Sequence, residues 1–102
     1  MRTAFPLAGL APGRLIGSRL SAIPLRLEIE EALANGVEVV FDFSGVGATQ
    51  SFVDELIGML IIKHGPAVLQ QIVFKSCSDD VRAIIEFVAA DRADQYLKAH
   101  SH

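Results

Sequence analysis

The stretch VEVVFDFSGVGATQSFVDELIGMLII, residues 37–62, decides the fold of this chain. Its first part, residues 37–43, is rich in β-branched and aromatic residues, which predicts a strand that stops at the turn-forming residues 44–47. Its second part predicts a helix that begins at Ser51 and is apolar on almost every side after Glu55. A strand followed by such a helix is half of a β-α-β unit. We therefore expect function where the strand becomes the helix, outside the carboxyl end of the strand.

A first helix is predicted over residues 21–34, before the central strand. Starting the helix at Ser21 places Pro24 in the first turn, where backbone N–H groups lack helical partners anyway. Asn35 and Gly36 are typical of a helix end.

Further elements lie on both sides of the central unit. Residues 69–75 predict the second main strand, and Ser78 predicts the cap of a last helix, which either continues through residues 96–97 or breaks near Asp91. Short strands are predicted at residues 3–5 and 14–16, at a sheet edge. Within the central helix, Gly58 predicts a close approach to the sheet, and residues 64–66 (HGP) predict the helix end.

This alternation predicts an α/β fold, with parallel pairing of the two main strands in a small mixed or partly parallel sheet and with helices over at least one face. The length predicts one domain spanning residues 1–102. Its N-terminal segment, residues 1–13, is weakly defined, and residues 91–102 form a C-terminal helix or tail.

The composition argues against several classes of protein. An apolar fraction of 51% with 21% charged residues excludes disorder, and a net charge of −3 with scattered basic residues argues against nucleic-acid binding. The uninterrupted apolar run at residues 59–62 is far too short to span a bilayer, so no membrane association is expected. Cys77 is the only cysteine, which excludes a disulfide framework and favours the reducing cytoplasm.

Three segments resemble the STAS superfamily, named for sulfate transporters and anti-sigma factor antagonists. They are Gly17-Ser18-Arg19, Asp42-Phe43-Ser44-Gly45-Val46, and QSFVDEL at residues 50–56. More closely, the chain resembles the STAS-like family of unknown function found as small bacterial stand-alone proteins, over residues 14–90. This resemblance implies helices mainly on one side of a sheet and a regulatory rather than catalytic role.

The resemblance also implies a phosphoacceptor. In anti-sigma factor antagonists, a strand ending in Asp-Leu-Ser-Gly-Val leads to Asp-Ser-Ser-Gly at a helix start, and a kinase of the histidine-kinase-like ATPase fold phosphorylates the first of those serines. The matching position here is Ser51, with Gln50, Phe52 and Val53 in place of the flanking residues. From its position alone, Ser51 is a helix N-cap worth about 1 kcal/mol. The two roles are compatible.

The same junction predicts the partner-binding or ligand-binding surface. Its candidate residues lie at the strand end, in the loop or in the first helical turn: Asp42, Ser44, Gly45, Gly47, Thr49, Gln50, Phe52, Asp54 and Glu55. Asp42 is expected to form a turn-closing hydrogen bond with the loop that follows. Arg19 and Arg26 are expected either to bind an anion or to pair with glutamates of their own helix. No cofactor, metal site or catalytic residue is predicted, because no His/Cys pair has metal-ligand spacing.

Three functions follow from these observations. The leading hypothesis is a regulatory module that binds a protein partner, an ATPase or kinase of the histidine-kinase-like fold, and is switched by phosphorylation of Ser51. The alternative is a sensor that binds a nucleotide or another small anion at the same loop. A third hypothesis is self-association into a homo-oligomer through apolar surface.

Overall fold

The computed structural model of the protein describes residues 1–7, 15–17 and 19–100. Three parallel strands form the main sheet in the order β1, β3, β5, and β2 pairs in parallel with β4. The strands are β1 (Arg2–Pro6), β2 (Leu15–Ile16), β3 (Glu38–Asp42), β4 (Gly47–Ala48) and β5 (Ile72–Lys75). These elements and the helices between them confirm the predicted α/β fold.

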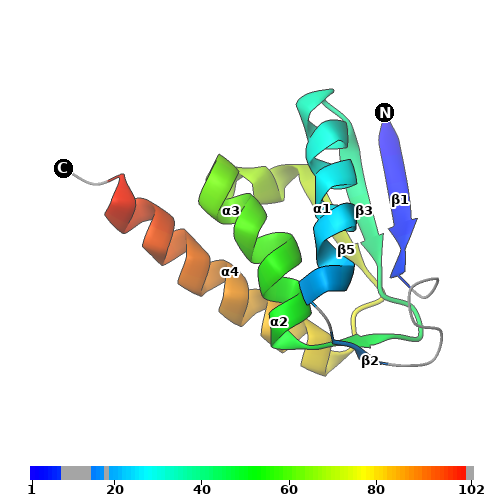
Figure 1. Ribbon diagram of the computed structural model, residues 1–102. Helices are drawn as coiled ribbons and strands as arrows, with labels where there is room; N and C mark the ends of the chain where they lie inside the picture. Colours follow the sequence, from blue (N-terminus) through cyan, green and yellow to red (C-terminus); the bar gives the residue numbers. More distant parts are fainter. Residues whose placement is uncertain (8–14, 18, 101–102) are drawn as a thin grey trace.

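The helices lie on one side of the strands in Figure 1. They are α1 (Arg19–Ala34), α2 (Gln50–Val53), the π-helical segment η2 (Asp54–Gly58), α3 (Met59–His64), the 3-10 segment η3 (Pro66–Gln71) and α4 (Asp79–Ala99). The segments α2, η2 and α3 follow one another without a break, and we call residues 50–64 the central helix. It ends as predicted, because Gly65 adopts a φ of +87° and Pro66 follows.

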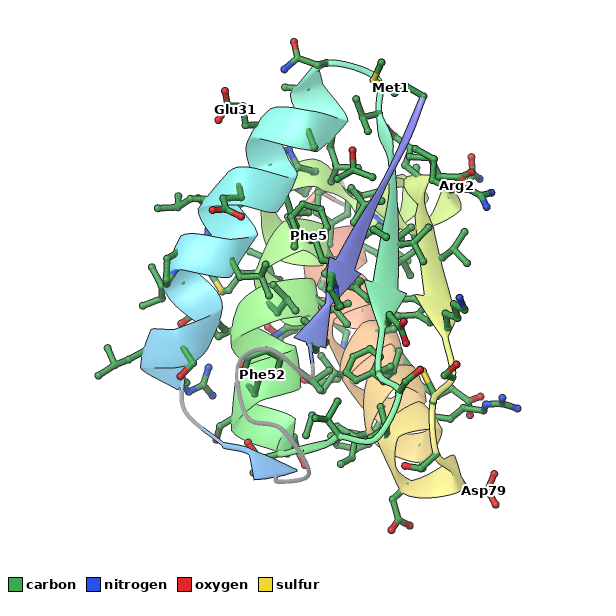
Figure 2. The ribbon with its side chains drawn as sticks, turned by 90° about the vertical axis from the view of Figure 1, so that its right-hand side faces the viewer. Met1, Arg2, Phe5, Glu31, Phe52 and Asp79 are labelled. Carbon is green, nitrogen blue, oxygen red and sulfur yellow. The ribbon has the colours of Figure 1, made fainter. Side chains whose placement is uncertain are left out.

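The sheet has two different faces because side chains alternate along each strand. Val39 and Phe41 are fully buried on the face that carries the helices, and Ile72 lies in register with Val39. On β1, Phe5 points to the same side (Figure 2) and its ring lies beside that of Phe41. Val73 lies on the other face and is 38% exposed. Helices therefore cover one face of the sheet, as predicted.

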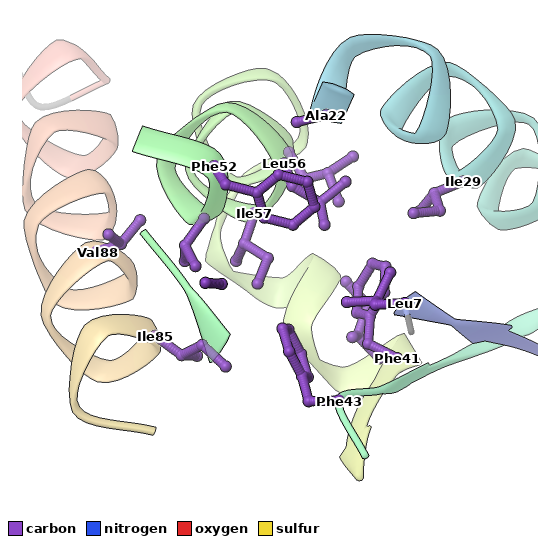
Figure 3. Close-up of a cluster of buried hydrophobic side chains, with 14 of the residues drawn as sticks. Leu7, Ala22, Ile29, Phe41, Phe43, Phe52, Leu56, Ile57, Ile85 and Val88 are labelled. Atoms are coloured by element: carbon purple, nitrogen blue, oxygen red, sulfur yellow. The ribbon is translucent and has the colours of Figure 1, made fainter. Parts of the chain in front are cut away.

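The core is built around the central helix. Figure 3 shows the Phe52 ring beside Leu56 and Ile57, with Phe41 and Phe43 of the β3 region on the opposite side of the cluster. All five of these side chains are almost fully buried. The apolar run after Glu55 therefore forms the middle of the domain, in agreement with the sequence pattern.

Two predicted element starts are wrong. Helix α1 begins at Arg19 rather than Ser21, and the Arg19 side chain binds an acidic residue of the central helix. Pro24 then lies in the second turn, where it faces solvent. Strand β5 begins at Ile72 rather than residue 69, because Pro66 favours the first turn of a helix and residues 66–71 form η3.

Other predicted boundaries agree with the structure. Helix α1 ends before Gly36, which has a φ of +74°, and α4 runs without interruption past Asp91. Ser78 caps α4, since its hydroxyl accepts a hydrogen bond of 3.2 Å from the amide of Val81. Strand β1 contains the predicted residues 3–5; of the predicted strand at 14–16, residues 15–16 form β2 and residue 14 lies outside the described residues.

Candidate functional site

The strand-to-helix junction begins with a turn closed by Asp42. Its carboxylate accepts hydrogen bonds from the Ser44 amide at 2.9 Å and the Ser44 hydroxyl at 2.5 Å, which confirms the expected turn. The Ser44 hydroxyl, followed by its amide, holds the pKa of Asp42 below its ordinary value. Gly45 follows with a φ of +71°, a left-handed conformation that favours glycine. Asp42 and Ser44 therefore shape the loop.

Thr49, not Ser51, is the N-cap of the central helix. The Thr49 hydroxyl accepts a hydrogen bond of 3.2 Å from the Phe52 amide and donates one of 3.1 Å to the Gly17 carbonyl. Gly47 lies two residues earlier in β4, which pairs with β2. The prediction that Ser51 caps the helix is wrong, because the helix begins at Gln50 and Ser51 is its second residue.

The first helical turn divides sharply between surface and core. Gln50 and Ser51 are exposed, and among the described residues the Ser51 hydroxyl has no hydrogen-bond partner. Phe52, in contrast, is fully buried with its ring in the core (Figure 3). Its inclusion in a partner-binding surface is therefore incompatible with the folded structure, because its large apolar side chain is needed to fill the core.

Asp54 is a buried charged group rather than a surface residue. It is 8% exposed, and Arg92 of α4 binds both of its carboxylate oxygens, at 2.7 and 2.6 Å. Arg19 of α1 donates a third hydrogen bond of 3.0 Å to the same carboxylate. The hydrogen bond from Arg92 is the main reason that the pKa of Asp54 lies below its ordinary value. Burial raises this pKa, whereas the hydrogen bond from Arg19 lowers it further. Asp54 thus joins three helices and is not available to a partner.

Gly58 creates the space for this ion pair. A Cβ at this position would lie 2.7 Å from an Asp54 carboxylate oxygen and 3.1 Å from Cγ of Arg92. The predicted close approach at Gly58 exists, but it is toward α4 rather than the sheet. Gly58 is the last residue of η2, and the backbone N–H of the next residue, Met59, donates a hydrogen bond to the Asp54 carbonyl.

Glu55 also forms a structural ion pair. Its carboxylate lies 3.5 Å from Nε of Arg26, whose guanidinium also donates a hydrogen bond of 2.7 Å to Glu30 of the same helix. His64 lies 3.0 Å from the other oxygen of Glu30. The expected pairing of Arg26 with its own helix is confirmed. Arg19 differs, because its partner, Asp54, is on the central helix.

A groove lies at the carboxyl ends of β3 and β5. It is lined by Phe43, Gly45, Val46, Gly47, Ser76, Cys77 and Ser78. Burial raises the pKa of the Cys77 thiol, so the thiolate form is disfavoured there. Across the described part of the chain, no group of three or more His, Cys, Asp or Glu side chains could hold a metal ion.

The outer face of α1 is a feature that the sequence analysis missed. Leu20, Pro24 and Leu27 are exposed there, with Leu20 78% and Leu27 57% accessible. Their spacing of four and three residues places them on one side of the helix, opposite the buried Ala22 and Ile29. The sequence contained a signal for this face, because these three apolar residues recur at helical spacing but lie outside the set of residues that faces the core. We call Leu20, Pro24 and Leu27 the α1 outer face.

No described helix is both long enough and apolar enough to cross a membrane.

Comparison with known proteins identifies one related family. The model of a family described as "STAS-like domain of unknown function" matches residues 21–82, well over half of the chain. This range includes the strand-to-helix junction from Asp42 to Glu55. No curated protein and no solved structure matches the chain.

Proposed function

The chain belongs to the family of STAS-like domains of unknown function, and on that premise we propose that it is a non-catalytic regulatory module that binds a partner protein. The binding surface consists of Gln50, Ser51 and the α1 outer face. Phosphorylation of Ser51 is the switch that changes the affinity of this surface for the partner.

The observation that carries this proposal is the position of Ser51. Thr49 provides the helix cap, so the fold does not use the hydroxyl of Ser51. The side chain is exposed in the first turn of the central helix, where a modifying enzyme can reach it. A phosphate there would meet the unpaired backbone N–H groups and positive end of the helix dipole.

Two acidic side chains close to Ser51 are paired with arginines, which reduces their repulsion of a phosphate. Asp54 is neutralised by Arg92 and Arg19, and Glu55 lies against Arg26. Phosphorylation adds close to two negative charges at a surface that is otherwise polar and uncharged at Gln50 and Ser51. The change in charge at the surface is therefore large.

The α1 outer face supplies apolar contact area beside this switch. Figure 1 shows the first turn of α1, which contains Leu20, next to α2. Exposed leucines in line on one helix face suit an apolar groove or helix of a partner. The resemblance to anti-sigma factor antagonists favours an ATPase or kinase of the histidine-kinase-like fold as that partner.

Affinity purification from the native cell, followed by intact-mass analysis of the recovered protein, tests this proposal. We expect an ATPase-type partner and a mass increase of one phosphate, which is lost in Ser51→Ala and retained in the control Ser21→Ala, another exposed serine. Equal partner binding by Ser51→Ala and Ser51→Asp would refute the switch. We expect Leu27→Gln to weaken binding, whereas Leu97→Gln, equally exposed on α4, should leave it unchanged.

A second function, binding of a small anion, is favoured by the groove at residues 43–47 and 76–78. Gly45, Gly47 and two serine hydroxyls border it, a combination suited to an anion. Thermal unfolding with millimolar nucleotides or inorganic phosphate tests this function, because a ligand of the folded state must raise the melting temperature. An unchanged melting temperature would exclude binding at such concentrations.

A further inference from the structure

Arg19 is bound to the fold differently from the other arginine that contacts Asp54. Arg92 binds both oxygens of the carboxylate and its side chain is 24% exposed, whereas Arg19 makes one hydrogen bond of 3.0 Å and is 50% exposed. If Arg19 moves away, both oxygens of Asp54 keep a guanidinium donor. The Arg19 side chain can therefore change partner without leaving a buried charge unpaired.

Ser51 lies within reach of this guanidinium. Ser51 and Asp54 are three residues apart on one continuous helix, a spacing that places their Cβ atoms about 5–6 Å apart. Arg19 already approaches Asp54 from the first turn of α1, which lies beside α2 (Figure 1). The Arg19 side chain is half exposed, so its rotation away from Asp54 is the movement that would bring it to a group on Ser51.

We propose that Arg19 receives a phosphate on Ser51, exchanging its single bond to Asp54 for the phosphate oxygens. This inference rests on the proposed phosphorylation of Ser51. A phosphate offers a planar guanidinium two parallel charge-assisted hydrogen bonds and nearly twice the charge of a carboxylate. Arg92 then remains the partner of Asp54, and the contacts among the central helix, α1 and α4 persist.

The change of partner by Arg19 links phosphorylation of Ser51 to the α1 outer face of the binding surface. Arg19 is the first residue of α1 and precedes Leu20, which is 78% exposed on the α1 outer face. A phosphate that holds Arg19 changes the charge that this first turn presents. The partner then meets a different surface at Leu20 and at Ser51, from a single covalent change.

The second ionisation of the phosphate tests the contact. The protein is produced with phosphoserine encoded at position 51, and the phosphorus NMR shift is followed through the titration near pH 6. We expect Arg19→Gln to increase the proton affinity of the phosphate about three- to tenfold. Arg19→Lys should increase it less, because the charge remains. The control Arg2→Gln removes the same charge at the opposite end of the molecule (Figure 2) and should have no effect.

A second measurement requires no substitution. In phosphorylated protein with nitrogen-15-labelled arginine, the guanidinium signals of Arg19 should shift as the phosphate ionises, whereas those of Arg2 should not. The proposal is overturned if the phosphate has the same second pKa in the unsubstituted phosphoprotein and in its Arg19→Gln variant. It is also overturned if the guanidinium signals of Arg19 do not shift as the phosphate ionises. Because the phosphate is encoded, these outcomes do not depend on a cellular kinase. Absence of phosphate on protein from native cells would count against the proposed function alone.

Discussion

Replacement of Gly58 by alanine should destabilise the domain, although the replacement of glycine by alanine within a helix usually stabilises a protein. Alanine in the interior of a helix normally stabilises by about 1 kcal/mol relative to glycine. Gly58 has helical backbone angles, so no backbone strain opposes the change. The added methyl group, however, would lie 2.7 Å from Asp54 Oδ1, 3.1 Å from Cγ of Arg92 and 3.2 Å from Cγ1 of Val88.

None of these neighbours can move without cost. Val88 of α4 is buried against the central helix, and Asp54 is a short side chain held by three hydrogen bonds from two arginines. Overpacking of this kind costs about 1–3 kcal/mol, and displacement of the carboxylate weakens its bonds to Arg92. The weakened hydrogen bonds cost about 1 kcal/mol more, which offsets the helix-propensity gain of about 1 kcal/mol, so we expect a net loss of about 1–3 kcal/mol.

Urea unfolding and thermal unfolding measure this effect. A loss of this size lowers the melting temperature by several degrees, since about 1 kcal/mol corresponds to 4–8 °C in a domain of this length. As a control, Ala90→Gly at an exposed position of α4 measures how much the free energy of unfolding changes between alanine and glycine when no packing is involved. If Gly58→Ala instead stabilises by about the amount that Ala90→Gly destabilises, the packing between the central helix and α4 is not as close as the structure indicates.

Two further predictions concern the cap and the buried ion pair. Thr49→Ala should lower the free energy of unfolding by about 1 kcal/mol, whereas Ser51→Ala should change it by less than about 0.5 kcal/mol; equal losses in urea unfolding would contradict the cap assignment. Because the folded-state pKa of Asp54 is lowered, its contribution is complete above its ordinary value of 3.8 and is lost as pH falls through the folded-state pKa. The difference in melting temperature between the original chain and Asp54→Asn should therefore shrink below about pH 4, and a constant difference down to pH 2.5 would argue against the ion pair.

The main elements were predictable because each is encoded locally. The β-branched run before Asp42 predicts the strand, the apolar run after Glu55 predicts a buried helix, and Gly36 and Ser78 predict a helix end and a helix start. The alternation of elements predicted helices over at least one face of the sheet, and the resemblance implied that they lie mainly on one side. These features depend on residues close together in the sequence.

The parts of the site that sequence reasoning missed depend on contacts between distant residues. Arg92 lies 38 residues from Asp54, and nothing local to either residue indicates their pairing. Without that partner, Asp54 read as a surface carboxylate beside Ser51. The Thr49 cap likewise has a distant contact that the local sequence does not indicate, since the Thr49 hydroxyl also donates a hydrogen bond to the Gly17 carbonyl after β2.

The order of the strands favours binding of a partner to the surface of the helices rather than binding of a ligand in a crevice at the strand ends. Ligands of open parallel sheets bind where the strand order reverses, because the helices there leave to opposite faces and open a crevice. In the main sheet, β1, β3 and β5 follow one another in a single direction, so their connecting helices lie on the same face and close against each other (Figure 1). The groove at Gly45 and Cys77 is consequently a surface feature at the strand ends. The exposed side chains that we propose for recognition lie instead on the first turn of α1, with Arg19 and Leu20, and on the first turn of the central helix, with Ser51.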